Sequence, residues 1–187
     1  LFPEMSEQSA DDDPQSIVHL IEDALSYAGL LLIPGLIGGI ILGERILRIY
    51  GDEFTQGTVV LAILTVSALV RAYQKQHLNT LNAIDRPDLS FRANALFVVA
   101  NLSLNVVLIY LYGWIGAAVA TALSVAISLV VSNRYLASIV NFTIPYKEIS
   151  RQWLSAIVMG IIVYGGLQLE NTYGVLEHNV ATVVLLV

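Results

Sequence analysis

The stretch ANLSLNVVLIYLYGWIGAAVAT, residues 100–121, carries the pattern that decides the fold. It contains two apolar runs separated by Gly113 and Trp114, and the first run includes Asn101 and Asn105. Hydrocarbon offers no hydrogen-bond partner, so an unsatisfied polar group there costs several kcal/mol. We therefore expect two antiparallel membrane helices joined at Gly113, with the asparagines turned towards other helices or a wet cavity.

The composition extends this interpretation to the whole chain. The 187 residues are 56% hydrophobic and 13% charged, with a mean hydropathy of +0.72, whereas a soluble domain has about 25% charged residues. These values predict an all-α, polytopic transmembrane helical bundle. Cysteine is absent, and the three histidines are not at metal-ligand spacing. We expect no metal, no cofactor, no enzymatic activity and no nucleic-acid partner.

About six spanning helices are expected. They cover residues 24–42, 57–84, 91–111, 114–133 and 153–169, and a last one begins near Asn179. A crossing needs about 20 residues, so the second helix must continue from its apolar start through a polar half. Residues 1–23 are expected to be a cytoplasmic acidic segment containing a helix start at Pro14. Residues 24–187 are the transmembrane C-terminal bundle, which we expect to be truncated at both ends.

Small residues and proline mark where helices are expected to pack closely or bend. Pro34 should kink the first span, and glycines four residues apart allow helices to approach each other closely. Gly113 fits a short turn, and a face of small residues follows it. The packing and hinge candidates are Pro34, Gly35, Gly39, Gly113 and Gly116.

Basic residues predict the orientation, because Lys and Arg gather on the cytoplasmic side. One side of the bundle collects Arg71, Lys75, Arg86, Arg92, Arg134, Lys147 and Arg151, and the other collects Arg45 and Arg48. The first side also holds the N-terminal segment. We therefore expect a multi-pass protein of the cell membrane with this segment in the cytoplasm.

The candidate substrate-path residues lie on two helices. Asn94, Asn101 and Asn105 fall within about 40° of one another on a helix that turns about 100° per residue. This polar stripe either forms hydrogen bonds between helices or lines a transport cavity. Arg71 and Lys75 share a face of the preceding helix with a further candidate, Asn82.

Two interpretations of Arg71 and Lys75 stay open. Their stems can lie in hydrocarbon while their heads reach the cytoplasmic headgroups. Alternatively, they face the cavity and hold the phosphate of a lipid carrier, to which Arg can bind through two hydrogen bonds. Gln74 and His77 are expected at the wetted end of the same helix.

In the order and spacing of these residues, the chain resembles the C-terminal half of the proteins of the multidrug/oligosaccharidyl-lipid/polysaccharide (MOP) exporter superfamily. The matching residues are Asn101, Asn105, Gly113, Gly116, Ala117, Ala118, Ala120 and Thr121. LFPEMSE (1–7) and IILGERILRIYGDEF (40–54) resemble a cytoplasmic segment and an external loop of the family. The polysaccharide and lipid-linked oligosaccharide flippase branch fits best, since the intramembrane acids of the drug exporters are not found.

The resemblance implies that the chain is the second bundle of a transporter with 12–14 helices that works by alternating access. It implies translocation of a polyprenyl-phosphate- or pyrophosphate-linked sugar or oligosaccharide for surface polysaccharide or glycoprotein glycan assembly. The implied partners are that carrier, the lipid bilayer and glycan-assembly enzymes. Two alternatives stay open: a cation-coupled drug or metabolite exporter of the same superfamily, and a non-transporting membrane scaffold of a glycan-assembly complex.

Overall fold

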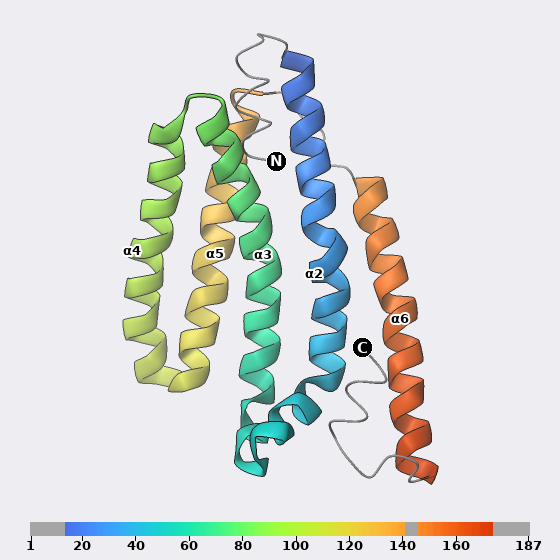
Figure 1. Cartoon of the computed structure of the whole chain (residues 1–187). Helices are drawn as coiled ribbons and strands as arrows, with labels where there is room; N and C mark the ends of the chain where they lie inside the picture. Colours follow the sequence, from blue (N-terminus) through green and yellow to red (C-terminus); the bar gives the residue numbers. More distant parts are fainter. Residues whose placement is uncertain (1–13, 141–145, 174–187) are drawn as a thin grey trace.

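The computed structural model describes the backbone of residues 14–140 and 146–173, and the side chains of residues 29–140 and 146–168. This part of the chain is all-α, as predicted, and the helices run up and down beside one another (Figure 1). In chain order the helices are α2 (Pro14–Tyr50), the 3₁₀-helix η1 (Asp52–Gly57), α3 (Thr58–Ala83), α4 (Pro87–Tyr112), α5 (Trp114–Ala137) and α6 (Tyr146–Tyr173).

Four segments among the described residues are long and apolar enough to cross a membrane. They are Gly29–Tyr50, Asp52–Ala83, Pro87–Tyr112 and Trp114–Ala137. The second of these includes the predicted polar continuation beyond Arg71. The helix α6 covers the predicted fifth span, 153–169, but is not among the four. Arg151, Gln152 and Gln168 lower the hydropathy of this helix, and the predicted sixth span lies outside the described residues.

The first helix is longer than its apolar core. As predicted, α2 begins at Pro14, and it continues without interruption through Pro34 to Tyr50, eight residues past the predicted span end at Leu42. The apolar run sets the part that can lie in hydrocarbon, whereas the helix itself continues beyond this run and through Pro34, which removes one backbone hydrogen bond. The predicted kink at Pro34 stays a prediction.

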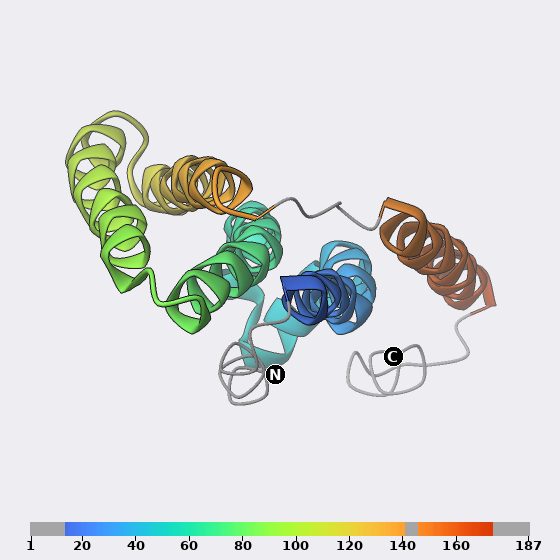
Figure 2. The same cartoon turned by 90° about the horizontal axis from the view of Figure 1, so that it is seen from above.

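The helix α3 is central, and it contacts α2, α4 and α5. The helix α4 packs mainly against α5, and α6 packs against α2 (Figure 2). One buried apolar cluster, around Leu81, Leu89 and Leu136, joins α3, α4 and α5. Another, around Ile33 and Leu69, joins α2 to α3 and includes Ala156 of α6. The described chain therefore consists of a three-helix group, α3–α5, with α2 and α6 beside it.

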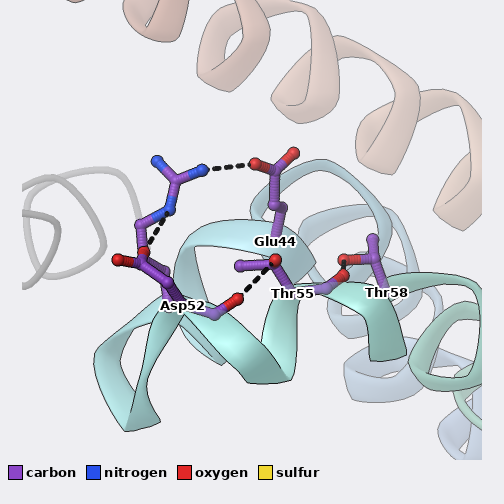
Figure 3. Close-up of polar contacts among 5 residues, drawn as sticks. Glu44, Asp52, Thr55 and Thr58 are labelled. Carbon is purple, nitrogen blue, oxygen red and sulfur yellow. Dashed lines mark hydrogen bonds and ion pairs between the residues drawn. The ribbon is translucent and has the colours of Figure 1, made fainter.

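The corner between α2 and α3 is held by local polar contacts (Figure 3). Arg48 Nη2 donates to Glu44 Oε1 at 2.6 Å, and its Nε lies 3.5 Å from Asp52 Oδ1. The hydroxyl of Thr55 donates to the Asp52 carbonyl, and that of Thr58 donates to the Thr55 carbonyl, both at 2.7 Å. These bonds connect the last turn of α2 through η1 to the first turn of α3.

Removing the Arg48 side chain should have little effect on stability. The side chains of Arg48 and Glu44 are 40% and 59% exposed, and exposed ion pairs typically contribute about 0–1 kcal/mol. We expect Arg48→Ala to change the free energy of unfolding by less than about 1 kcal/mol. Thermal unfolding of the purified full-length protein in detergent checks this, and a fall as large as that of a core substitution would contradict it.

Candidate functional site

Arg71 lies near the middle of α3, and its side chain is exposed, as are those of Lys75 and Asn82. The three positions share one face of the helix by their spacing of four and seven residues. In the part of the chain that the structure describes, no carboxylate lies within ion-pair distance of Arg71 or Lys75. The positive charges of Arg71 and Lys75 thus lie on an exposed face of α3.

The guanidinium of Arg71 reaches across to α4. Its Cζ lies 4.8 Å from the centroid of the Phe97 ring, a cation–π arrangement. Phe97 comes three residues after Asn94 and four before Asn101, so all three are neighbours on the surface of α4. The contact therefore brings Arg71 to the side of α4 that carries the asparagine stripe. We call this surface the polar face, and it consists of Arg71, Lys75, Asn82, Asn94, Phe97, Asn101 and Asn105.

The three asparagines differ in their surroundings. Asn94 is exposed, whereas Asn101 and Asn105 are half-buried. The Nδ2 of Asn101 lies 3.5 Å from the Thr121 hydroxyl of α5, and the Nδ2 of Asn105 donates to the Asn101 carbonyl at 2.8 Å. Thr121 itself donates to the Ala117 carbonyl at 3.0 Å. Asn101 thus reaches α5 at the outer limit of hydrogen-bond distance, Asn105 bonds within α4, and Asn94 is exposed.

Gln74 and His77 correct a prediction made from the sequence. They are only 3% and 5% exposed, so they do not form a wetted helix end. The Nε2 of Gln74 donates to the Ser128 hydroxyl at 2.7 Å, and that hydroxyl donates to the Ala93 carbonyl at 2.8 Å. The prediction was wrong because α5 covers this face of α3. A repeat of serines every four residues in α5, ending at Ser132, was the sequence signal for this packing.

The turn between α4 and α5 depends on glycine at two positions. Gly113 has φ 61° and ψ −142°, a conformation that residues with a Cβ avoid. A Cβ at Gly116 would collide with the carbonyl oxygen of Leu108, which belongs to the backbone of α4. The two helices therefore approach each other here more closely than a side chain at 116 would allow.

The packing candidates on α2 lie in different environments. A Cβ at Gly39 would lie 3.5 Å from Cγ2 of Thr65, so this position faces α3 at ordinary contact distance. Gly35 is exposed, and a Cβ there would meet no described atom within 4 Å. Pro34 is half-buried within the helix. Of the two glycines, Gly39 faces another helix of the described chain and Gly35 does not.

A pocket of about 360 Å³ lies among α3, α5 and α6. Its lining includes Tyr73 and His77 of α3, Asn133 of α5 and Trp153 of α6. Tyr73 is two residues from Arg71, about 200° around the helix, so the pocket opens on a different side of α3 from the polar face. Its lining comes from three separate helices, so the pattern within any one helix could not predict this pocket.

The chemistry of the polar face is that of charge and hydrogen bonding. A guanidinium and an ammonium can neutralise a phosphate, and carboxamides can donate to and accept from sugar hydroxyls. The described residues contain no group of three or more His, Cys, Asp or Glu that could hold a metal ion. The arrangement suits the passage of an anionic, hydroxyl-rich headgroup.

Comparison with known proteins assigns residues 1–185 to the family model described as lipid II flippase MurJ. Over 166 residues the chain is 36% identical to "Probable flippase AglR" of Haloferax volcanii, covering 87% of this chain and 35% of that one. It is 35% identical over 166 residues to "Probable low-salt glycan biosynthesis flippase Agl15" of the same organism, covering 88% and 35%. The chain thus spans about a third of the length of these relatives.

A solved structure shares the fold. The "Lipid II flippase MurJ, inward closed conformation" matches with a TM-score of 0.77 and 20% sequence identity, over 97% of this chain and 39% of that one. The family model and the two Haloferax volcanii relatives confirm the resemblance to lipid-linked glycan flippases of the MOP type. The chain belongs to the lipid II flippase MurJ family.

Proposed function

We propose that the full-length protein moves a polyprenyl-linked sugar or oligosaccharide from the cytoplasmic to the external leaflet by alternating access. The family match over residues 1–185 carries this proposal. The names of AglR and Agl15 support it, since both are described as flippases and the second is linked to glycan biosynthesis. The activity belongs to the whole protein, of which this chain contributes part of the second bundle, and the transported product serves surface polysaccharide or glycoprotein assembly.

The polar face is the proposed path of the carrier headgroup. Phe97 follows Arg92 by five residues of α4, which is a rise of about 8 Å at 1.5 Å per residue. Because the Arg71 guanidinium lies on the Phe97 ring, it is at about the same height along α4 as Phe97. From Arg92 to Tyr112 the helix rises about 30 Å, the thickness of the hydrocarbon core. If the hydrocarbon core extends from Arg92 to Tyr112, the Arg71 guanidinium lies within it.

A cation at this depth needs a polar environment. A charged residue that faces lipid costs up to about 2.5–3.5 kcal/mol, the full value applying at the centre of a membrane helix. Stacking on Phe97 offsets only part of this cost, because a cation–π contact contributes about 0.5–2 kcal/mol. An aqueous cavity between the two bundles satisfies the guanidinium, and the carrier phosphate would pair with it there. Lys75 and Asn82 continue this path towards the cytoplasm. The asparagines of α4 continue it in the other direction, where they would form hydrogen bonds with the sugar.

The proposed orientation of the chain in the membrane rests on the distribution of its basic residues. The α3–α4 turn, the end of α5 and the start of α6 lie towards the end of the bundle where α2 begins (Figure 1). These connections and their flanking turns carry Arg86, Arg92, Arg134, Lys147 and Arg151. By the positive-inside rule this end faces the cytoplasm. The protein is then a multi-pass protein of the cell membrane, and its cytoplasmic face would meet the enzymes that assemble the glycan.

The two alternatives are not favoured. A cation-coupled drug or metabolite exporter fits poorly with a family match and two relatives that are all described as flippases. A non-transporting scaffold would need its polar side chains packed tightly between helices, yet Arg71, Lys75, Asn82 and Asn94 are exposed. The flippases of this family are transporters rather than catalysts, which agrees with a role that forms or breaks no covalent bond.

Depletion of the full-length protein in its own cells tests the proposal. We expect the polyprenyl-linked glycan to accumulate on the cytoplasmic side while the external glycan falls. Mass spectrometry of extracted lipid, with and without treatment of intact cells by a membrane-impermeant glycosidase, separates the two pools. Depleted cells that keep a normal external pool and surface glycosylation would contradict the proposal.

A further inference from the structure

A chain of buried hydrogen bonds connects three helices behind the polar face. Gln74 of α3 donates to Ser128 of α5 at 2.7 Å, and Ser128 donates to the Ala93 carbonyl of α4 at 2.8 Å. Gln74 is 3% exposed and Ser128 is 0% exposed. We call these three residues the brace. It uses both the acceptor and the donor capacity of a single hydroxyl, so Ser128 is the point where α3, α4 and α5 meet.

The brace and the Arg71–Phe97 contact form a closed ring. Gln74 follows Arg71 by three residues, so the two are neighbours on the surface of α3. In an α-helix the Ala93 carbonyl accepts the N–H of Phe97, four residues on. The Ala93 carbonyl oxygen therefore accepts two hydrogen bonds, one from the Ser128 hydroxyl and one from the backbone N–H of Phe97. A shift of α3 against α4 that separates Arg71 from Phe97 would also stretch the brace.

The neighbouring serines of α5 show that this arrangement is specific to one position. Ser124 and Ser132 are each 0% exposed, like Ser128. However, Ser124 donates to the Ala120 carbonyl and Ser132 to the Leu129 carbonyl, both within α5. Burial of serine on this face is therefore a common feature, whereas the bond between helices belongs to Ser128.

We propose that Gln74 and Ser128 are positioning residues, which hold α3 and α4 in register so that Arg71 stays on Phe97 at the polar face. The functional consequence rests on the proposed flippase activity: α3, α4 and α5 would move as one body, and the cation would keep its place between the two bundles. Neither residue belongs to the polar face, because both are buried where α3 packs against α5.

The test measures how close positions 71 and 97 lie to each other, without relying on transport. In the full-length protein, with cysteines elsewhere replaced, Arg71→Cys and Phe97→Cys supply a thiol pair for a short bifunctional cross-linker; this chain has no cysteine of its own. Ser128→Ala and Gln74→Met, the second nearly equal in shape, are each added to this pair. Ser124→Ala is the matched control, because it removes a buried hydroxyl that bonds only within α5.

We expect each brace substitution to lower the cross-linking yield by up to about threefold, because one typical hydrogen bond between membrane helices changes the equilibrium constant for keeping the two helices in register by about that factor. Ser124→Ala should leave the yield unchanged. Yields in Ser128→Ala and Gln74→Met equal to that of Ser124→Ala, with all proteins at normal level, would overturn the proposal. The same substitutions in protein that retains Arg71 should lower glycan export. If export stays normal although the yield falls, the flippase role of Arg71 fails while the brace stands.

Discussion

Gly116→Ala is expected to destabilise the protein strongly, although alanine favours helix more than glycine does. The added Cβ would collide with the Leu108 carbonyl oxygen and lie 2.9 Å from the Ile109 nitrogen. Both atoms are helix backbone and cannot rotate away, so α5 must move off α4. Overpacking of this kind costs about 1–3 kcal/mol. Thermal unfolding of the purified full-length protein should show a fall of several degrees, and the amount of protein in the membrane should drop.

The matched control is Gly35→Ala, because it makes the same chemical change in another spanning helix. A Cβ at 35 meets no described atom within 4 Å. The higher helix propensity of alanine, about 1 kcal/mol above glycine, should leave stability unchanged or slightly raised. Equal losses of stability in Gly116→Ala and Gly35→Ala would contradict the close approach of α4 and α5 described above.

Arg71→Ala is expected to reduce glycan export about tenfold or more at a normal protein level. A hydrogen bond to a charged group contributes about 1.5–3 kcal/mol, and each 1.4 kcal/mol corresponds to a factor of ten. The side chain is exposed and makes no ion pair within the described residues, so its removal should not unfold the bundle. Export is measured as glycan on the cell surface in a strain that lacks the native gene.

Arg71→Lys and Arg134→Ala sharpen this experiment. Lysine keeps the charge but loses the planar group that stacks on Phe97 and binds two phosphate oxygens, so we expect partial export. Arg134 lies exposed in the last turn of α5, a helix that carries none of the polar-face residues, and its replacement should leave export unchanged. Normal export in both Arg71→Ala and Arg71→Lys would remove Arg71 from the proposed path.

The sequence predicted the helices well because apolar length is a local property. The turn at Gly113 and the continuation of α3 past Arg71 both agree with the structure. Helix ends were less accurate, since α2 and α6 extend well beyond their apolar cores. The six-residue η1 between α2 and α3 was not predicted, because its residues, DEFTQG, are typical of a polar loop.

The site was harder to predict, because periodicity places a residue on a face without showing what covers that face. Arg71, Lys75 and Gln74 are all polar residues of one helical turn. The structure leaves the first two exposed and buries the third against Ser128, which lies 54 residues along the chain. The partner of Arg71 is an aromatic ring rather than an acid, so a search for opposite charges four residues away could not find it.

A flipping measurement with purified components shows whether the protein itself moves a lipid-linked sugar across a bilayer. The full-length protein is placed in sealed vesicles that contain a polyprenyl-linked sugar, and a membrane-impermeant reagent modifies the sugar of the outer leaflet. We expect protein-containing vesicles to make the inner pool accessible much faster than protein-free vesicles. Arg71→Ala should remove most of this difference, whereas Arg134→Ala should keep it. An inner pool that stays protected in vesicles with folded protein, or equal rates for Arg71→Ala and the unmodified protein, would contradict this expectation.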